Sequence, residues 1–310
     1  MPQPQVTESG PFAERLLRTT LERACRHADV DARGAELIHV TVNAIFRLTS
    51  APIIVRIAAS PSLMPRVERV VAAAKWLEHQ GVAAVRLTTV DQPLLVQETG
   101  HVVTFWQYLP QTDAPLTAGE LAKPLRSLHS LPLPQFDLPR WDPIPTARAR
   151  VQACPEDSLT AQERRWFTDY ADVLNEELNS LSFPLKRSVI HGDAYVGNLL
   201  RDQNGAAVLC DLDSLCFGPP EWDLIPELVG HIRYHRPSGE YQRLVDAYGF
   251  DPRSWPGHQT LLRAREYLVL TGVLPVLDSS PGIATEFHHR IRSLRDGDHE
   301  AQWTPFGRAA

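Results

Sequence analysis

Cysteine is scarce in this chain, and long apolar runs are absent. Its 310 residues include only Cys25, Cys154, Cys210 and Cys216, whose spacing matches no metal-ligand pattern, and we expect Cys210 and Cys216 to be small buried side chains. No run reaches 18 apolar residues, and the first ten residues, MPQPQVTESG, are polar. The sequence therefore predicts neither a membrane-spanning helix nor a cleavable leader, and we expect a cytoplasmic protein without a membrane partner.

The chain also lacks the excess of positive charge that is typical of nucleic-acid-binding proteins. It carries 31 Lys and Arg against 37 Asp and Glu, a net charge of −6, which argues against a nucleic-acid partner. The imbalance is uneven, because residues 1–108 have a net charge of +1 and the remainder has −7. The acidic part either steers a cationic substrate or is a solvated surface, and the sequence leaves both alternatives open.

A length of 310 residues exceeds one ordinary core, so we expect two lobes. The hydrophobic periodicity of the first 108 residues predicts a small sheet with helix packed on it. The expected helices are 11–28 and 66–79, and the expected strands are 36–48 (with an irregular point at 41–43), 52–58, 85–90, 94–98 and 101–108.

Proline is frequent from residue 110 to 145, which we interpret as the crossing into a second, mainly helical lobe. Farther on, Asn204-Gly205 separates two short apolar runs and predicts a β-hairpin turn. The expected strands are 198–201 and 207–211, and the expected helices are 121–131, 160–181, 222–234, 240–248, 259–277 and 286–295.

The most informative stretch is 190–213. It places Asp193 five residues before Asn198, with Asp211 after the expected hairpin. A loop carboxylate such as Asp193 can accept a hydroxyl proton, while oxygens of Asn198 and Asp211 suit Mg²⁺ on a nucleotide, which together form a minimal set for phosphoryl transfer. Asp213 competes for the metal. In a strand the two carboxylates would face opposite sides, so we expect only one of them to coordinate, and we favour Asp211 because it is the first Asp of the motif. A turn with capping carboxylates is the alternative without chemistry.

The motif HGDxxxxN at 191–198, followed by DLD at 211–213, resembles the signature of the aminoglycoside phosphotransferase family. Segments 104–110, 218–224 and 294–306 are similar to the family's hinge, to the part after its metal-binding Asp and to its C-terminus. The resemblance thus covers essentially the whole chain.

That resemblance implies an α+β fold of the bilobal protein-kinase-like type. It implies a small antiparallel-sheet lobe at 1–108 that binds the nucleotide and a mainly helical lobe at 109–310 for catalysis and the acceptor.

The resemblance also implies a role for each motif residue. Asp193 would be the catalytic base, and Asn198 and Asp211 would hold Mg²⁺. His191 would brace the loop of Asp193, and Asp223 would order that loop from a neighbouring segment. Asp213 would then support the site without coordinating the metal.

A lysine on the third strand normally contacts the nucleotide phosphates in this fold, and here it is missing. The only lysine in the first 108 residues is Lys75, in the expected helix 66–79. The strand at 52–58 carries Arg56, whose planar fork can bind phosphate. We therefore assign Arg56 to the phosphates, with Glu68 of the helix as its partner. The alternative is a surface arginine on an edge strand.

A glycine-rich phosphate loop is missing too. Thr41 and Asn43 occupy the corresponding turn and are candidates for phosphate contacts, although such residues in a turn need no function. Backbone groups of the hinge at Gln107 and Leu109 would bind the base. The sequence does not choose between ATP and GTP.

For the acceptor site, we expect polar side chains on the later helices. Glu227 and His231 share one helical face and Glu266 lies on another helix, where carboxylates can bind ammonium groups. Surface or capping roles are the alternative for all three residues.

These features and the resemblance predict an enzyme that moves the γ-phosphoryl group of a nucleoside triphosphate to a hydroxyl of a small, cationic acceptor, above all an aminoglycoside-like or other antibiotic. The alternatives are a kinase of a small metabolite of choline, homoserine or sugar type, and an inactive kinase-like nucleotide-binding module. The sequence gives no indication of the oligomeric state.

Overall fold

The computed structural model describes residues 10–40, 42–111 and 114–306. The chain divides into two compact units. Unit 1 comprises Met1–Leu116, Leu133–Leu138 and Asn198–Leu215, and unit 2 comprises Thr117–Pro132, Pro139–Gly197 and Cys216–Ala310. The division therefore departs from a single boundary after residue 108, because the segment Asn198–Leu215 groups with the N-terminal residues. The HGDxxxxN motif is split between the units, with its Asp in unit 2 and its Asn in unit 1.

Unit 1 contains a five-stranded antiparallel sheet with the strand order β1-β2-β3-β5-β4. Its strands are β1 (Glu36–Val40), β2 (Asn43–Arg47), β3 (Ile53–Ala58), β4 (Leu94–Val96) and β5 (His101–Gln107).

The expected strand at 85–90 is wrong. The backbone bonds of this segment are divided between two partners, since the N–H of Val85 donates to Leu209 and that of Thr88 donates to Phe105. A single continuous ladder therefore does not form there.

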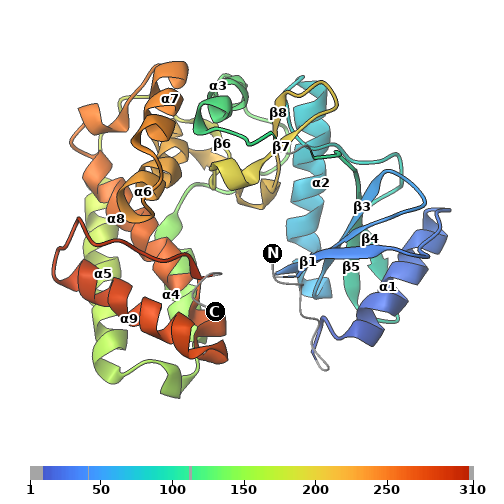
Figure 1. The fold of residues 1–310 in the computed structure, drawn as a ribbon, viewed down its shortest axis with the longest axis horizontal. Helices are drawn as coiled ribbons and strands as arrows, with labels where there is room; N and C mark the ends of the chain where they lie inside the picture. Colours follow the sequence, from blue (N-terminus) through green and yellow to red (C-terminus); the bar gives the residue numbers. More distant parts are fainter. Residues whose placement is uncertain (1–9, 41, 112–113, 307–310) are drawn as a thin grey trace. The chain divides into compact units, whose positions relative to one another are not determined.

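Two helices cover opposite faces of this sheet (Figure 1), α1 (Glu14–His27) and α2 (Met64–His79). Side chains alternate along β3, so Val55 and Ile57 pack in the cluster of α1, whereas Ala58 packs with Val67 of α2. Arg56 has the parity of Ala58 and so lies on the α2 face. The prediction of a sheet with packed helix is confirmed.

A short hairpin completes unit 1, with β7 (Leu199–Arg201) paired antiparallel to β8 (Ala207–Leu209). The expected turn is confirmed, and the Asp202 carboxylate accepts the N–H groups of Asn204 and Ala206. The strand β8 ends two residues earlier than expected, so Asp211 lies after the strand and not at its end.

Unit 2 is mainly helical, as expected, with one two-stranded antiparallel sheet, β6 (Ser188–Ile190) with β9 (Cys216–Gly218). Among its helices, α4 was not expected, because prolines dominate its start. Pro143 occupies the first turn, where the missing N–H costs nothing. The helices are α3 (Ala122–His129), α4 (Pro143–Ala153), α5 (Ala161–Ser180), α6 (Ile225–Arg233), α7 (Ser238–Tyr248), α8 (His258–Thr271) and α9 (Pro281–Arg295).

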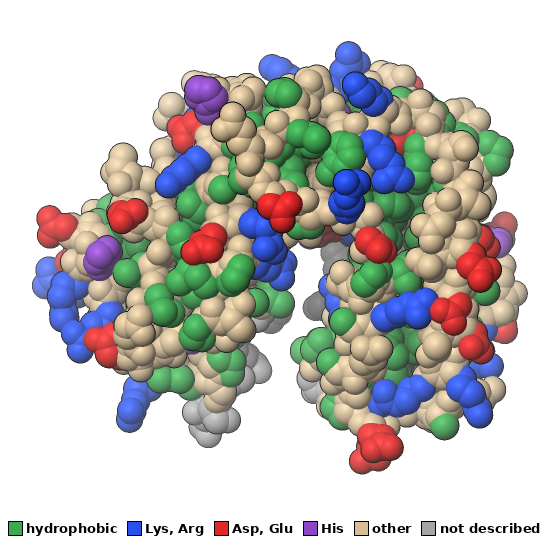
Figure 2. Space-filling view, turned by 180° about the vertical axis from the view of Figure 1, so that it is seen from behind, with side chains coloured by type: hydrophobic (Ala, Val, Ile, Leu, Met, Phe, Trp, Pro, Cys, Tyr) green, Lys and Arg blue, Asp and Glu red, His purple; other side chains and the backbone are tan. Residues whose placement is uncertain are grey.

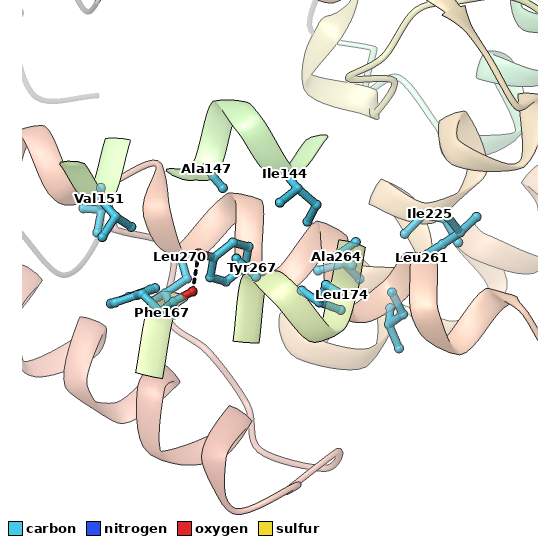
Figure 3. Close-up of a cluster of buried hydrophobic side chains, with 14 of the residues drawn as sticks. Ile144, Ala147, Val151, Phe167, Leu174, Ile225, Leu261, Ala264, Tyr267 and Leu270 are labelled. Atoms are coloured by element: carbon cyan, nitrogen blue, oxygen red, sulfur yellow. Dashed lines mark hydrogen bonds between the residues drawn. The ribbon is translucent and has the colours of Figure 1, made fainter. Parts of the chain in front are cut away.

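The main core of unit 2 lies between α4, α5 and α8 (Figure 3), and α8 also packs against α6. Phe167 of α5 and Tyr267 of α8 are buried there, and the Tyr267 hydroxyl donates to the Phe167 carbonyl at 2.9 Å. This core fixes α6 and α8, the two helices that reach the loop of Asp193.

On the face of the molecule drawn in Figure 2, charged side chains are not separated by sign. Basic and acidic side chains are interspersed over the visible face of each unit (Figure 2). Across residues 10–40, 42–111 and 114–306, helices long and apolar enough to cross a membrane are not found. The four cysteines are thiols that form no disulfide within the described residues, and burial raises the pKa of Cys210 and of Cys216 to about 12, so both stay protonated.

Candidate active site

The HGD loop, residues 191–197, leaves β6 in a tight turn. Gly192 has φ +82°, a left-handed conformation that costs a glycine little. A single carboxylate, that of Asp223, accepts the N–H of His191 at 2.7 Å and the N–H of Gly192 at 2.8 Å. The loop backbone just before Asp193 is therefore held at two consecutive residues.

Asp223 is itself fully buried and completely satisfied. It has 0% exposure, and His129 of α3 lies with Nε2 3.0 Å from its Oδ2. The indole of Trp222 donates to the Gly192 carbonyl at 2.9 Å, which adds a further tie to the loop. Asp223 thus binds the backbone of the HGD loop. His129 was missed, because nothing local to residue 129 indicates a partner 94 positions later.

Asp193 follows this turn with a half-exposed side chain, at 31% exposure. Its carboxylate forms an ion pair with Arg265 of α8, whose side chain is 12% exposed. A charge-assisted bond of this kind restricts the carboxylate to one orientation. Sequence reasoning missed Arg265, since an arginine in an amphipathic helix carries no local signal of its partner.

Glu227 of α6 has a different role from the one expected. It is 2% exposed, accepts the Val196 N–H at 2.8 Å, and receives two bonds of 2.8 Å from Arg236. Its carboxylate is therefore committed to the HGD loop and neutralised. His231 is half-buried and stacks on Tyr241.

Glu266 is also unavailable as a free carboxylate. It is 1% exposed and lies 2.5 Å from Nε of Arg233, a buried ion pair. Arg233 further donates to the carbonyls of Asp298 and Ala301, so the pair anchors the segment after α9. The expectation that Glu227 and Glu266 offer free negative charge to an acceptor is not met.

In unit 1, the β7–β8 hairpin brings Asn198 and Asp211 to the same end. Leu199 pairs with Leu209, and the N–H of Cys210 donates to the Asn198 carbonyl at 2.9 Å. Asp211 follows with φ 57° and ψ 66°, a left-handed conformation rare outside glycine, asparagine and aspartate. This conformation changes the direction of the chain just after β8.

Because of this turn, the argument that Asp211 and Asp213 face opposite sides of a strand is wrong. The 3₁₀ turn η5 (Leu212–Ser214) follows Asp211, and Asp213 binds arginine instead. Burial would raise the pKa of Asp213, but Arg56, the Asp211 side chain and Arg66 together hold that pKa below its usual range.

Arg56 has Asp213 as its partner, and the predicted pairing with Glu68 is wrong. Nη2 of Arg56 lies 2.5 Å from Oδ2 of Asp213. The face of α2 that is buried against the sheet carries Val67 and Val70, whereas Glu68 is exposed. A carboxylate for Arg56 therefore has to come from another element.

The turn and hinge predictions have mixed outcomes. Thr41 lies outside the described residues, and the amide of Asn43, with its oxygen toward Arg56, accepts from Nη2 at 2.7 Å. The N–H of Gln107 is already bound to the Arg86 carbonyl at 2.9 Å. Gln107 and Leu109 line a cavity of about 610 Å³ within unit 1. Their contact with a base stays a prediction.

A sequence profile of the phosphotransferase enzyme family matches residues 40–258, more than two thirds of the chain. This chain belongs to the phosphotransferase enzyme family. The resemblance to aminoglycoside phosphotransferases is therefore confirmed, and the enzyme is a phosphotransferase whose substrate the family does not specify. A search of curated protein sequences finds no match.

Solved structures share the fold at low sequence identity. The amicoumacin kinase hAmiN, in complex with AMP-PNP, Ca²⁺ and Ami, has TM-score 0.69 and 12% identity, over 94% of this chain and 97% of that one. Choline kinase LicA from Streptococcus pneumoniae has TM-score 0.66 and 13% identity, with 90% and 99% covered. Aminoglycoside phosphotransferase APH(3'')-Id from Streptomyces rimosus has TM-score 0.57 and 19% identity, with 82% and 98% covered. The protein-kinase-like fold is thus confirmed.

Proposed function

We propose that this phosphotransferase moves the γ-phosphoryl group of ATP or GTP to a hydroxyl of a small molecule, with Asp193 as the base. The observation that carries the proposal is the construction of the HGD loop. One buried carboxylate, Asp223, holds two consecutive N–H groups next to Asp193, while the Asp193 carboxylate stays half-exposed. A base that must meet a hydroxyl at a defined angle needs this combination of a fixed backbone and a partly exposed side chain.

The residues at the end of the β7–β8 hairpin fit Mg²⁺. Asn198 offers a neutral amide oxygen and Asp211 an anionic carboxylate oxygen, the hard donors that Mg²⁺ takes in small number beside nucleotide phosphates. When bound, Mg²⁺ supplies charge neutralisation on the transferred phosphoryl group. Asn198 and Asp211 would hold the ion, and Arg56 would donate N–H groups to phosphate oxygens.

In the proposed transfer, one bond to the γ-phosphorus forms and one breaks. The acceptor hydroxyl oxygen forms a bond to the γ-phosphorus, the bond from that phosphorus to the bridging oxygen breaks, and the nucleoside diphosphate leaves. Asp193 accepts the hydroxyl proton late in this transfer, because the transition state is loose. Arg265 orients the Asp193 carboxylate toward the hydroxyl.

The first candidate acceptor is an antibiotic with amino groups. Its support is the similarity in fold to kinases named for amicoumacin and to aminoglycoside phosphotransferases, together with the net charge of −7 after residue 108. The second candidate is a small metabolite. The observation that favours it is that Glu227 and Glu266 are neutralised by Arg236 and Arg233, which removes two ligands for ammonium groups.

The test is transfer of labelled γ-phosphate to a panel of aminoglycosides, amino alcohols and sugars, with calorimetry of Mg²⁺–ATP and Mg²⁺–GTP. We expect Asp193→Asn to lower turnover by about 10²–10⁴-fold and to leave nucleotide binding near normal. Asp169→Asn, an exposed carboxylate on α5, is the matched control and should change neither. Undetectable nucleotide binding by the wild-type chain would show an inactive module instead.

A further inference from the structure

We propose that Arg66 is a second phosphate-binding residue, which works beside Arg56 on the nucleotide's β- and γ-phosphates. The inference rests on the proposed function, because it assigns a new contact within the same nucleotide site. Its basis is a cluster within unit 1 in which two guanidinium groups, Arg56 from β3 and Arg66 from α2, meet one carboxylate, Asp213 of η5.

The geometry of this cluster is that of an anion held between two cations. Nη2 of Arg56 is 2.5 Å from Oδ2 of Asp213, and Nε of Arg66 is 3.1 Å from Oδ1. Oδ2 has no aligned hydrogen bond with any described residue, so the Arg56 contact is a charge contact. A carboxylate and a phosphate present similar pairs of oxygens to a guanidinium fork. The two arginines are thus pre-oriented for oxyanions.

The cluster is buried on the side of Arg56 and Asp213, whose side chains are only 14% and 10% exposed, and burial strengthens the interactions of their charges. Asp213 faces both arginines and also contacts the side chain of Asp211, the proposed Mg²⁺ ligand. Asn43, the other described partner of Arg56, is neutral. A triphosphate would bring further oxyanions to the two arginines.

Arg66 is the most exposed of the three charged residues in this cluster. Its side chain is 46% exposed, against 14% for Arg56. The ion pair with Asp213 uses Nε, and a hydrogen bond from either Nη group is not found within residues 10–40, 42–111 and 114–306. Arg66 is also the third residue of the 16-residue helix α2, so the positive end of the helix dipole lies beside it. Both features favour an anion at this edge.

Arg69 provides a matched control on the same helix. It lies three residues after Arg66, is half-buried, and forms no ion pair with the described residues. Loss of its charge changes the net charge of α2 by the same amount without touching Asp213. If Arg66 contacts the phosphates, Arg66→Gln should weaken ATP binding and Arg69→Gln should not. A general effect of the charge of α2 would weaken ATP binding equally in both variants.

The experiment measures dissociation constants of Mg²⁺–ATP, Mg²⁺–ADP and AMP by displacement of a fluorescent ATP analogue. We expect Arg66→Gln to weaken ATP binding by about tenfold, the scale of one charge-assisted hydrogen bond, and AMP binding by less than about twofold. Arg66→Lys should fall between Arg66→Gln and wild type, because it keeps the charge and loses the fork. Arg69→Gln should leave all three constants unchanged.

Two results would overturn the assignment. An equal loss for ATP and AMP would show that Arg66 acts through the packing of unit 1, and an unchanged ATP constant in a folded Arg66→Gln variant would exclude a contact. A wild-type chain that binds no nucleotide would instead overturn the proposed function, so the two failures are distinguishable. Thermal unfolding of each variant confirms that Arg66→Lys and Arg66→Gln are folded.

Discussion

The two halves of the HGDxxxxN–DLD motif are stabilised by different means. In unit 2, the carboxylate of Asp223 is satisfied by backbone N–H groups and His129, and it is fully buried. In unit 1, the carboxylate of Asp213 forms ion pairs with two arginines, one of them half-exposed. Asp223 therefore holds the chain itself, whereas Asp213 holds side chains that a phosphate can also bind.

The difference suggests a division of labour. Backbone N–H bonds to a buried carboxylate are not exchanged for a ligand, so the loop before Asp193 keeps one geometry. Arginine forks bound to Asp213 can be shared with incoming oxyanions without loss of their orientation. Changes in unit 2 should therefore affect turnover and stability, and changes in unit 1 should affect nucleotide affinity.

Among the changes in unit 1, the largest expected effect is at Asp211. We predict that Asp211→Asn, which tolerates the left-handed backbone and loses the charge, weakens Mg²⁺–nucleotide binding by at least about tenfold. Calorimetry with Mg²⁺–ATP measures it. Asp91→Asn, which removes the same charge from an exposed position elsewhere in unit 1, is the control and should bind ATP normally. Normal ATP binding by Asp211→Asn would contradict the prediction that changes in unit 1 affect nucleotide affinity.

The reciprocal change in unit 2 is Asp223→Asn. An amide keeps one acceptor oxygen and points an NH₂ group at the second backbone N–H, so we predict a loss of about 2–3 kcal/mol in unfolding free energy and slower turnover. Chemical denaturation and steady-state kinetics check both. Nucleotide affinity should stay near wild type, and a selective loss of ATP binding would contradict the comparison. Asp246→Asn on the exposed side of α7 is the control.

Arg265 tests whether the side chain of Asp193 needs its own support. We predict that Arg265→Gln lowers kcat about tenfold with an unchanged KM for the nucleotide, because it removes one charge-assisted bond that orients the carboxylate. Arg265→Lys should restore part of the rate. Arg292→Gln, an exposed arginine on α9, should have no effect. A rise in the KM for ATP without a fall in kcat would count against a role in orientation.

The smallest expected effect is at Glu221, a buried carboxylate that lacks the full partner set of Asp223. Burial raises its pKa, although Oε1 accepts the Leu185 N–H at 2.6 Å, and Oε2 finds no partner among the described residues. A carboxyl whose pKa is raised on folding stabilises the fold below its unfolded pKa and loses this contribution as pH rises through the folded pKa.

We therefore predict that Glu221→Gln raises the unfolding free energy at pH 7 by about 1 kcal/mol. The gain should disappear below about pH 4, where the carboxyl is protonated in both states. Urea denaturation across this pH range measures the effect. Glu176→Gln, an exposed position on α5, should show no such pH dependence, and a gain that persists at pH 3 would exclude ionisation as its cause.

Local patterns predicted most of the fold. Apolar spacing located α1, α2, α5 and the strands of the sheet, and Asn204-Gly205 located the β7–β8 turn. The errors occurred where non-local bonds decide, as at 85–90, whose backbone pairs with β8 and β5. Helix α4 was missed because frequent proline usually indicates the absence of helix. Here Pro143 lies in the first turn, where proline is tolerated, and composition alone does not show where a helix begins.

The site divides in the same way. The motif by itself determined Asp193, Asn198 and Asp211 as candidates, because their spacing along a loop and a hairpin is a local property of the chain. Only the tertiary structure decided which charges these residues and their neighbours meet. Asp213 reaches Arg56, Arg265 reaches Asp193, and Arg236 and Arg233 neutralise Glu227 and Glu266. The physical reason is that an ion pair depends on the packing of distant elements, which leaves no periodic trace in the sequence.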